Sequence, residues 1–108
     1  MSIESIKSRS ATHTRSIAAL TLSDAGRKIA DDMCRGVIAL IEEVIAVKVS
    51  SGEDAALDAF YDGLVRVYAR AGWGRMGWID KVQMMRTASL EDMGNVRALR
   101  ASIKISRL

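Results

Sequence analysis

The chain has 108 residues, 49% of them hydrophobic and 27% charged. This is the balance of one ordinary globular domain and excludes a disordered chain. No apolar run reaches the roughly 18 uncharged residues of a membrane span, and no secretory signal is evident, so we expect a cytoplasmic protein. One cysteine excludes an internal disulfide and fits a reducing compartment.

The formal charge of +3 is unevenly distributed along the chain. Residues 1–63 hold seven Lys/Arg against ten Asp/Glu, a charge of −3, whereas residues 64–108 hold nine against three, a charge of +6. Such an asymmetry permits an anionic partner at the C-terminal end, or head-to-tail charge complementarity.

The first twenty residues are rich in Ser and Thr with scattered charge. They predict a flexible or extended N-terminal arm, followed by a single helical domain at residues 21–108. His13 lies in this arm, where a solvated surface side chain is the simplest interpretation.

Apolar residues at helical spacing predict a long first helix from about Ile29, preceded by Ser23 as a capping residue. Gly36 lies inside this helix and would let another helix approach closely. The apolar stripe is too broad for one small set of neighbours, which predicts a homodimer whose first helices cross near their centres. The interface residues would be Cys34, Val37, Ile38, Ile41 and Ile45. Cys34 fits either a small apolar residue of the stripe or a contact with the same residue of the second copy.

A second helix is expected at residues 53–71, with Ser51 and Asp54 near capping-box spacing and Gly72 at its end. A short third helix would carry Ile79, Val82 and Met85. A fourth would begin after Ser89 and place one apolar face inward, made of Leu90, Met93, Val96, Leu99 and Ile103. The predicted fold is therefore a small all-α bundle of three to four helices.

The sequence offers little catalytic chemistry. Gly72, Gly74 and Gly77 match G-x-G-x-x-G, but they follow a helix rather than a strand, so a nucleotide cradle is not expected. One Cys and one His, 21 positions apart, make neither a metal site nor a nucleophilic pair. Paired carboxylates fall on polar helix faces or helix starts, where solvation explains them. We expect a non-enzymatic protein without a cofactor or metal.

Large apolar residues gather between positions 73 and 85, in and after a glycine-rich stretch. Trp and Met are enriched at interfaces, because Trp offers rigid contact area and Met packs adaptably. The residues of this predicted protein-binding surface are Trp73, Met76, Trp78, Ile79, Met84 and Met85. The alternative is that both tryptophans fold back over the helix ends.

Four basic residues step by three, four and three along the last predicted helix: Arg97, Arg100, Lys104 and Arg107. This basic stripe supports a second hypothesis, a small nucleic-acid-binding regulator. The chain shows no helix-turn-helix pattern, and a charged stripe opposite an apolar one is also typical of a solvated face.

The segments "GRKIADDMCRGVIALIEEVIAVKV" and "GWGRMGW", with the short all-α chain and lone cysteine, resemble the small bacterial antiactivators of Pseudomonas quorum sensing. The resemblance implies a homodimer that binds the ligand-binding domain of a LuxR-type transcription factor such as LasR. It further implies that binding blocks dimerisation and DNA binding of that factor. No residue roles follow from the resemblance.

Overall fold

A computed structural model describes residues 2–87 and the backbone of residues 96–108, with side chains from position 97 onward in the second range. In these ranges the chain forms five α-helices, one 3₁₀ helix and no strand, which confirms the all-α prediction. The bounds are α1 (Ile3–Ala18), α2 (Asp24–Ser51), α3 (Glu53–Ala71), η1 (Trp73–Arg75), α4 (Trp78–Arg86) and α5 (Val96–Ser106).

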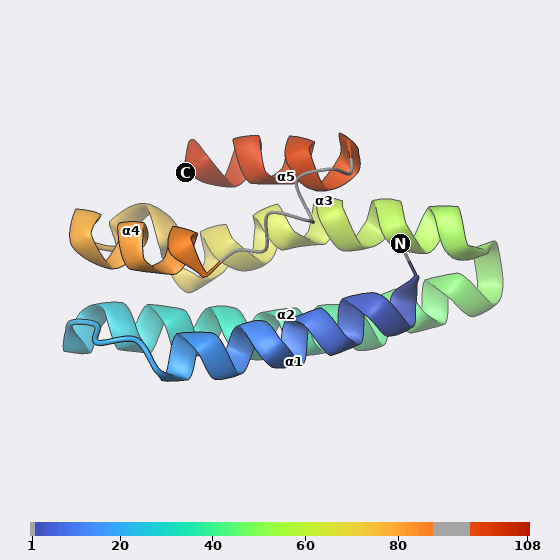
Figure 1. Cartoon of the computed structure of the whole chain (residues 1–108). Coiled ribbons are helices and arrows are strands. Elements are labelled where there is room, and N and C mark those ends of the chain that lie inside the picture. The colour runs from blue at the N-terminus through green and yellow to red at the C-terminus, as the bar shows by residue number, and fades with distance from the viewer. Residues whose placement is uncertain (1, 88–95) are drawn as a thin grey trace.

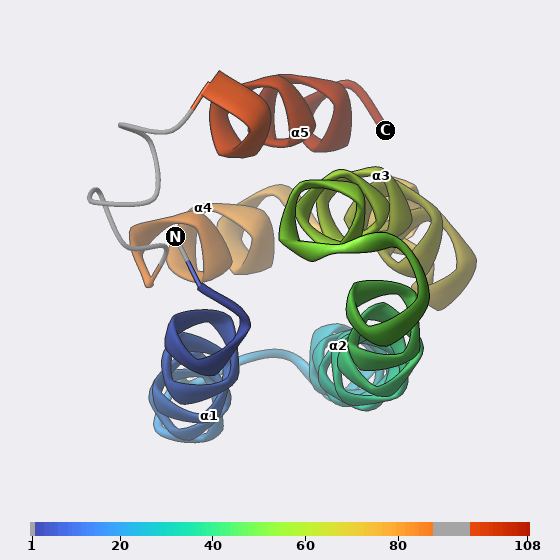
Figure 2. The same cartoon turned by 90° about the vertical axis from the view of Figure 1, so that its right-hand side faces the viewer.

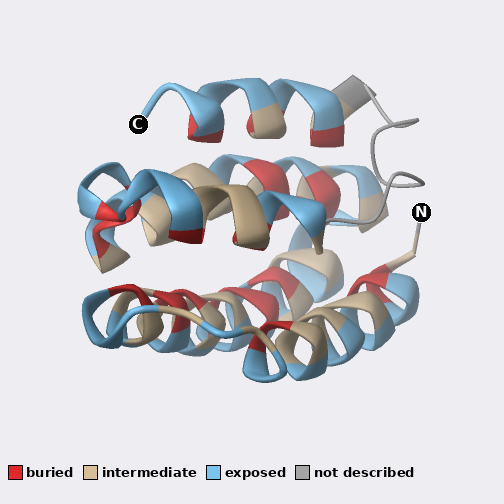
Figure 3. Ribbon diagram, turned by 60° about the vertical axis from the view of Figure 1, so that its left-hand side comes forward, coloured by how far each residue is buried: buried red, intermediate tan, exposed pale blue. Residues whose placement is uncertain are grey.

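The helices lie in three tiers (Figure 1). The first tier holds α1 and α2 side by side, the second holds α3 and α4, and α5 covers α3 from the third. The end-on view shows α3 stacked on α2 and α4 above α1 (Figure 2), and the side view shows that α4 lies at only one end of the bundle (Figure 1). Figure 3 places the buried residues on the sides of the helices that face one another.

Residues 3–18 form helix α1, so the prediction of an extended or flexible arm is wrong there. The hydroxyl of Ser2 caps the helix by accepting a hydrogen bond from the backbone N–H of Ser5 at 3.1 Å. Ile3, Ile6 and Ile17 are buried in the core, and they tie both ends of α1 to the bundle. The helix was not predicted because Ser and Thr, which favour turns and caps, fill most positions between the isoleucines.

The boundaries of α2 and α3 follow local chemistry. The Ser23 hydroxyl accepts from the Gly26 N–H at 3.1 Å, which confirms the predicted cap of α2. Gly52, with φ 93°, joins α2 to α3 without a side-chain cap, so the predicted Ser51/Asp54 capping box is wrong. Gly72 ends α3 in the left-handed region at φ 102°, as expected for a C-terminal glycine.

Two glycines bring α2 and α3 together. A Cβ at Gly36 would lie 2.5 Å from Cγ1 of Val67, and a Cβ at Gly63 would lie 2.4 Å from Cδ1 of Leu40. Each glycine therefore makes space for a side chain of the opposite helix. The expectation that Gly36 admits a close neighbour is confirmed.

The last helix presents a different face to the bundle from the one predicted. Ala98, Ala101 and Ile105 are buried, whereas Leu99 and Ile103 are exposed. Small alanines let α5 lie close to α3, which explains why the larger residues point away. The predicted cap and first apolar positions, Ser89, Leu90 and Met93, lie outside the described residues.

Candidate functional site

The glycine-rich segment after α3 folds its first tryptophan into the core. Trp73 is 3% exposed and packs against Tyr68, with ring centroids 5.6 Å apart. The ammonium group of Lys81 lies 5.6 Å from the centre of the indole ring, within range of a cation–π contact. Met76 and Met84 are buried in the same core cluster. Three of the six predicted partner-binding residues are therefore core residues, and their prediction as a binding surface is wrong.

Asp80 fixes the start of α4 to the start of α2. Its carboxylate accepts from the Ser23 hydroxyl at 2.5 Å and from the Ser23 backbone N–H at 3.2 Å. Asp80 is only 7% exposed, and it lies at the N-terminus of α2, where the helix dipole favours a negative charge. A Cβ at Gly26 would lie 2.1 Å from Oδ2 of Asp80, so the carboxylate fits only because residue 26 has no side chain.

The opposite side of α4 carries large apolar side chains that reach solvent. Trp78 is 78% exposed and Ile79 is 71% exposed, and Met85 is also exposed. Trp78, half-buried Val82 and Met85 follow one another at steps of four and three, so they share one face of the helix. We call Trp78, Ile79, Val82 and Met85 the α4 surface. Contiguous exposed apolar residues of this size are typical of interaction sites.

In the described segment that contains α4, the charged side chains that reach solvent are basic. Within residues 73–87, Arg75 and Arg86 are exposed and Lys81 is half-buried, whereas the carboxylate of Asp80 is buried against Ser23. Lys81 follows Trp78 by three positions and Arg86 follows Val82 by four, so positive charge borders the α4 surface along the helix itself, and we call these two residues its positive rim. Such a surface is complementary to an apolar patch bordered by carboxylates.

The residues predicted for a dimer interface also divide into residues packed in the core and residues that reach solvent. Ile41 is buried in the core, while Cys34, Val37 and Ile45 are half-buried and pack against core residues. Only Ile38 projects clearly into solvent, with 53% of its surface exposed. The prediction was wrong for Ile41 because α1 and α3 together cover the stripe. Burial also raises the pKa of the Cys34 thiol above its ordinary value.

The basic stripe on α5 lies beside acidic residues of α3. Nε of Arg97 lies 2.8 Å from Oδ1 of Asp58, and its Nη1 lies 3.8 Å from Oδ1 of Asp54. Arg100 and Lys104 line a shallow hollow together with Asp58 and Asp62. Arg107, like Arg100 and Lys104, is exposed. These neighbouring carboxylates lower the positive potential that phosphates would meet on this side.

Sequence reasoning missed a group of polar residues on α1 that face the interior. His13 is half-buried, with Nδ1 3.4 Å from the Thr87 hydroxyl at the end of α4, so its interpretation as a solvated side chain is wrong. The pattern that could have revealed it is the recurrence of Ile3, Ile6, His13 and Ile17 at helical spacing, with Ser10 completing the series.

Within the described ranges, no helix combines the length and apolar character that crossing a bilayer requires. The same ranges hold no cluster of three His, Cys, Asp or Glu that could ligate a metal. Comparisons with protein-family models, with curated proteins and with solved structures found no match to the chain.

Proposed function

We propose that the protein is a cytoplasmic, non-enzymatic regulator that acts by binding another protein through the α4 surface. The observation that carries this proposal is the exposure of Trp78 and Ile79 on a helix whose other side is held in the core. Trp is among the residues that contribute most binding energy at interfaces, because it removes a large rigid area from water.

The rigidity of α4 supports a binding role. Asp80 binds Ser23, and Met84 is buried beside Trp73, so the helix is fixed at both its start and its end. A preorganised surface loses little conformational entropy when it binds, which leaves more of the apolar burial available as affinity.

The proposed partner is a transcription factor of the LuxR type, as the resemblance to quorum-sensing antiactivators suggests. In this mechanism the α4 surface covers an apolar dimerisation face on the factor, and its positive rim pairs with acidic residues bordering that face. The covered factor then neither dimerises nor binds DNA.

A homodimer is the second part of the proposal. The residues of α2 that remain available are Ile38 and Val49, both exposed and aligned with half-buried Ile45 at steps of seven and four. Light scattering at micromolar concentration is expected to give twice the 11.8 kDa mass of one chain. An Ile38→Asp variant should then give the single-chain mass, and a wild-type protein that is monomeric contradicts this part.

The nucleic-acid hypothesis remains the second candidate because Arg100, Lys104 and Arg107 are exposed on one helix. It predicts affinity that falls steeply with salt and is lost when these three residues are changed together. The carboxylates beside Arg97 favour the protein partner instead.

The test of the protein-binding function compares two double variants of similar apolar content. Trp78→Ala/Ile79→Ala removes the α4 surface, and Leu99→Ala/Ile103→Ala removes exposed apolar residues of α5. Calorimetric titration against a purified LuxR-type ligand-binding domain should show at least about 30-fold weaker binding for the first variant, the loss of a hot spot of about 2 kcal/mol. The second variant should bind as the wild type does. Equal affinity of both variants overturns the assignment, as does the absence of binding by the wild type.

A further inference from the structure

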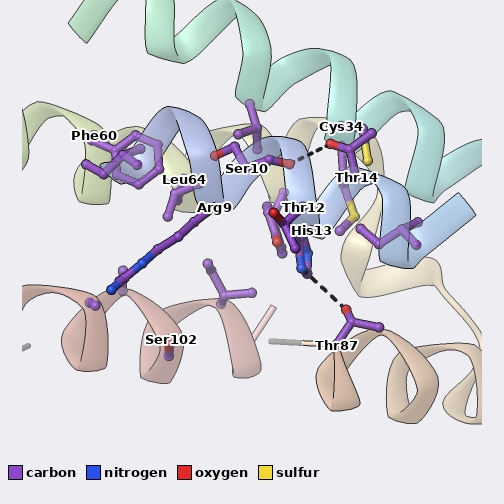
Figure 4. A pocket seen from close by; sticks show the side chains of 18 of the residues that line it. Arg9, Ser10, Thr12, His13, Thr14, Cys34, Phe60, Leu64, Thr87 and Ser102 are labelled. Carbon is purple, nitrogen blue, oxygen red and sulfur yellow. Dashed lines mark hydrogen bonds between the residues drawn. The ribbon is translucent and has the colours of Figure 1, made fainter. Parts of the chain in front are cut away.

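A cavity of about 350 Å³ lies between α1, α2, α3 and α5, and Thr87 at the end of α4 also lines it. Figure 4 shows it from close by, with labelled side chains of the four helices around it. Well-packed interiors contain few voids larger than a water molecule, and a cavity of about 150 Å³ already binds benzene. The cavity is therefore large enough to hold a small organic molecule.

The cavity exists because two helices line it with short side chains. Ser10 of α1, and Ala101 and Ser102 of α5, are among the lining residues. Elsewhere α1 buries large residues, since Ile6 and Ile17 on either side of Ser10 are in the core. A larger apolar residue at position 10 would fill the space and stabilise the fold, so the present sequence leaves the space unfilled at a cost in stability.

The helices α2 and α3 supply aromatic rings and sulfur atoms to the lining. The chain has only one Phe and two Tyr, and all three line the cavity, as Phe60, Tyr61 and Tyr68. Met33 and Cys34 line it from α2. Aromatic rings attract a further ring edge-to-face or in an offset stack, and a thioether sulfur packs favourably against the edge of a ring. The lining therefore favours an aromatic ligand over a saturated one of equal size.

Two hydroxyl groups of the lining donate their protons within or at the end of their own helices. The Thr14 hydroxyl donates to the backbone carbonyl of Ser10 at 2.9 Å, and the Thr87 hydroxyl donates to that of Met84 at 2.7 Å. Because these protons are already used, neither hydroxyl offers a donor to an anion in the cavity.

The basic side chains Arg9 and His13 of the lining also have partners in the protein. Nδ1 of His13 lies 3.4 Å from the Thr87 hydroxyl, and Arg9 has an interaction of its own. Figure 4 shows the two side chains extending in different directions, so they do not meet at one point. A charged ligand would give up its hydration here without a matched partner, which is costly, whereas an uncharged aromatic ligand has little hydration to lose.

We propose that this cavity binds an uncharged molecule with two fused aromatic rings, which pack against Phe60, Leu64 and Met33. The volume supports this size, because about 350 Å³ is roughly twice the volume of a cavity that holds one benzene ring. None of the described residues that line the cavity belongs to the α4 surface, so the site is independent of the protein-binding function.

The direct test is calorimetric titration of the full chain with 1-naphthol and with decahydro-1-naphthol, which has the same carbon skeleton without aromatic rings. 1-Naphthol should bind saturably, with a dissociation constant below about 1 mM. The saturated alcohol should bind about fivefold more weakly, because it cannot make the contacts between rings. No saturable binding of 1-naphthol up to about 2 mM overturns the proposal, and equal affinities of the two alcohols contradict the aromatic class.

A second titration tests the charge of the ligand. 1-Naphthoate carries a carboxylate on the same two rings, and it should bind at least about tenfold more weakly than 1-naphthol. Equal or tighter binding of 1-naphthoate contradicts the assignment to an uncharged ligand.

Methyl NMR spectra locate the bound molecule. Val37, Leu64 and Ile105 line the cavity, whereas Val49 and Ile79 are exposed and lie outside its lining. Saturating 1-naphthol should shift the methyl signals of the first three residues and leave those of the other two unchanged. Shifts confined to Val49 or Ile79 would place the probe on exposed apolar surface and refute the assignment to the cavity.

Filling the cavity should prevent binding. Ser10→Leu adds an apolar side chain from α1, and it should weaken 1-naphthol binding at least about tenfold and raise the thermal stability. Ser5→Leu is the matched control, since Ser5 is an exposed residue of the same helix outside the cavity lining, and it should bind as the wild type does. If Ser10→Leu does not fold, Val37→Phe fills the same space from α2 and decides. Full affinity in a folded filling variant, or an equal loss in Ser5→Leu, overturns the proposal.

Discussion

The hydroxyl and the backbone N–H of Ser23 both donate to the carboxylate of Asp80, which lies 57 positions further along the chain. The two bonds join the first residue before α2 to the first turn of α4. Because Asp80 is almost fully buried, the bonds act in a medium where water competes little. The pair therefore sets the position of the helix that carries Trp78 and Ile79.

Replacing Asp80 should destabilise the fold much more than replacing an exposed aspartate. Asp80→Ala removes a buried acceptor that holds two donors of Ser23, and we expect a loss of about 2–4 kcal/mol in the free energy of unfolding. Asp31→Ala, on the exposed side of α2, should change it by no more than about 0.5 kcal/mol. Urea denaturation of both variants provides the comparison. Equal losses would show that the Ser23–Asp80 pair stabilises the fold no more than an exposed aspartate does.

Substitution of the two tryptophans should have very different effects on stability. Trp73→Ala creates a core cavity beside Tyr68 and should lower the free energy of unfolding by about 3–5 kcal/mol. Trp78→Ala should change it by at most about 0.5 kcal/mol, since the side chain is exposed in the free protein. Acrylamide quenching checks the same difference by fluorescence. Trp78 alone, in a Trp73→Phe variant, should be quenched strongly, and weak quenching there would contradict its exposure.

Gly36 should tolerate alanine only when its neighbour is reduced. Gly36→Ala gains helix propensity of about 1 kcal/mol, but the new Cβ meets Cγ1 of Val67, whose branched side chain has little rotamer freedom. We expect a net loss of about 1–3 kcal/mol in the wild-type background. In a Val67→Ala background the same change should stabilise the protein, as measured by a double-mutant cycle. A cost that is the same in both backgrounds would rule out the contact as its cause.

Tyr68 should make the protein less stable in strong alkali. Burial raises its pKa from 10.0 to about 12, so the folded state keeps the phenol proton after the unfolded chain has lost it. The stability that this group contributes is complete below pH 10 and is lost as the pH rises to about 12, a total of about 3 kcal/mol. Tyr68→Phe should therefore have a smaller loss of stability between pH 10 and 12 than the wild type in urea denaturation. Parallel pH profiles for the two proteins would contradict the burial of the phenol.

Some elements could be predicted from the sequence because one local pattern decides them. The repeated apolar residues of α2 and α3 predict helices, and Ser23 and Gly72 mark their ends through backbone geometry that depends on few neighbours. Helix α1 carries the same spacing, but only three isoleucines show it and Ser and Thr hide it. Its formation depends on contacts with α2 and α3 that no local window contains.

The candidate site, too, depends on contacts between residues that are distant in the sequence. The sequence identified Trp73 and Trp78 as unusual, but both follow glycines, so the turns between them could not be placed in register. Trp73 packs against Tyr68 in the core, and the helix that carries Trp78 is held by Asp80, whose partner Ser23 is distant in the sequence. The cavity beside α1 was missed for a related reason, since a helix that is not predicted cannot be given an inner face.

Helix α1 has a consequence for which part of α2 can contact a second copy of the chain. Ile3 and Ile6 of α1 pack in one core cluster with Leu40, Ile41 and Val44 of α2, and Ile38 and Val49 are the large hydrophobic residues of α2 that stay exposed. The N-terminal helix thus covers part of the stripe that the sequence alone assigned to the second copy. A protein lacking residues 2–18 would expose the apolar residues of α2 and α3 that α1 covers. We expect such a protein to self-associate, because association would remove this apolar surface from water.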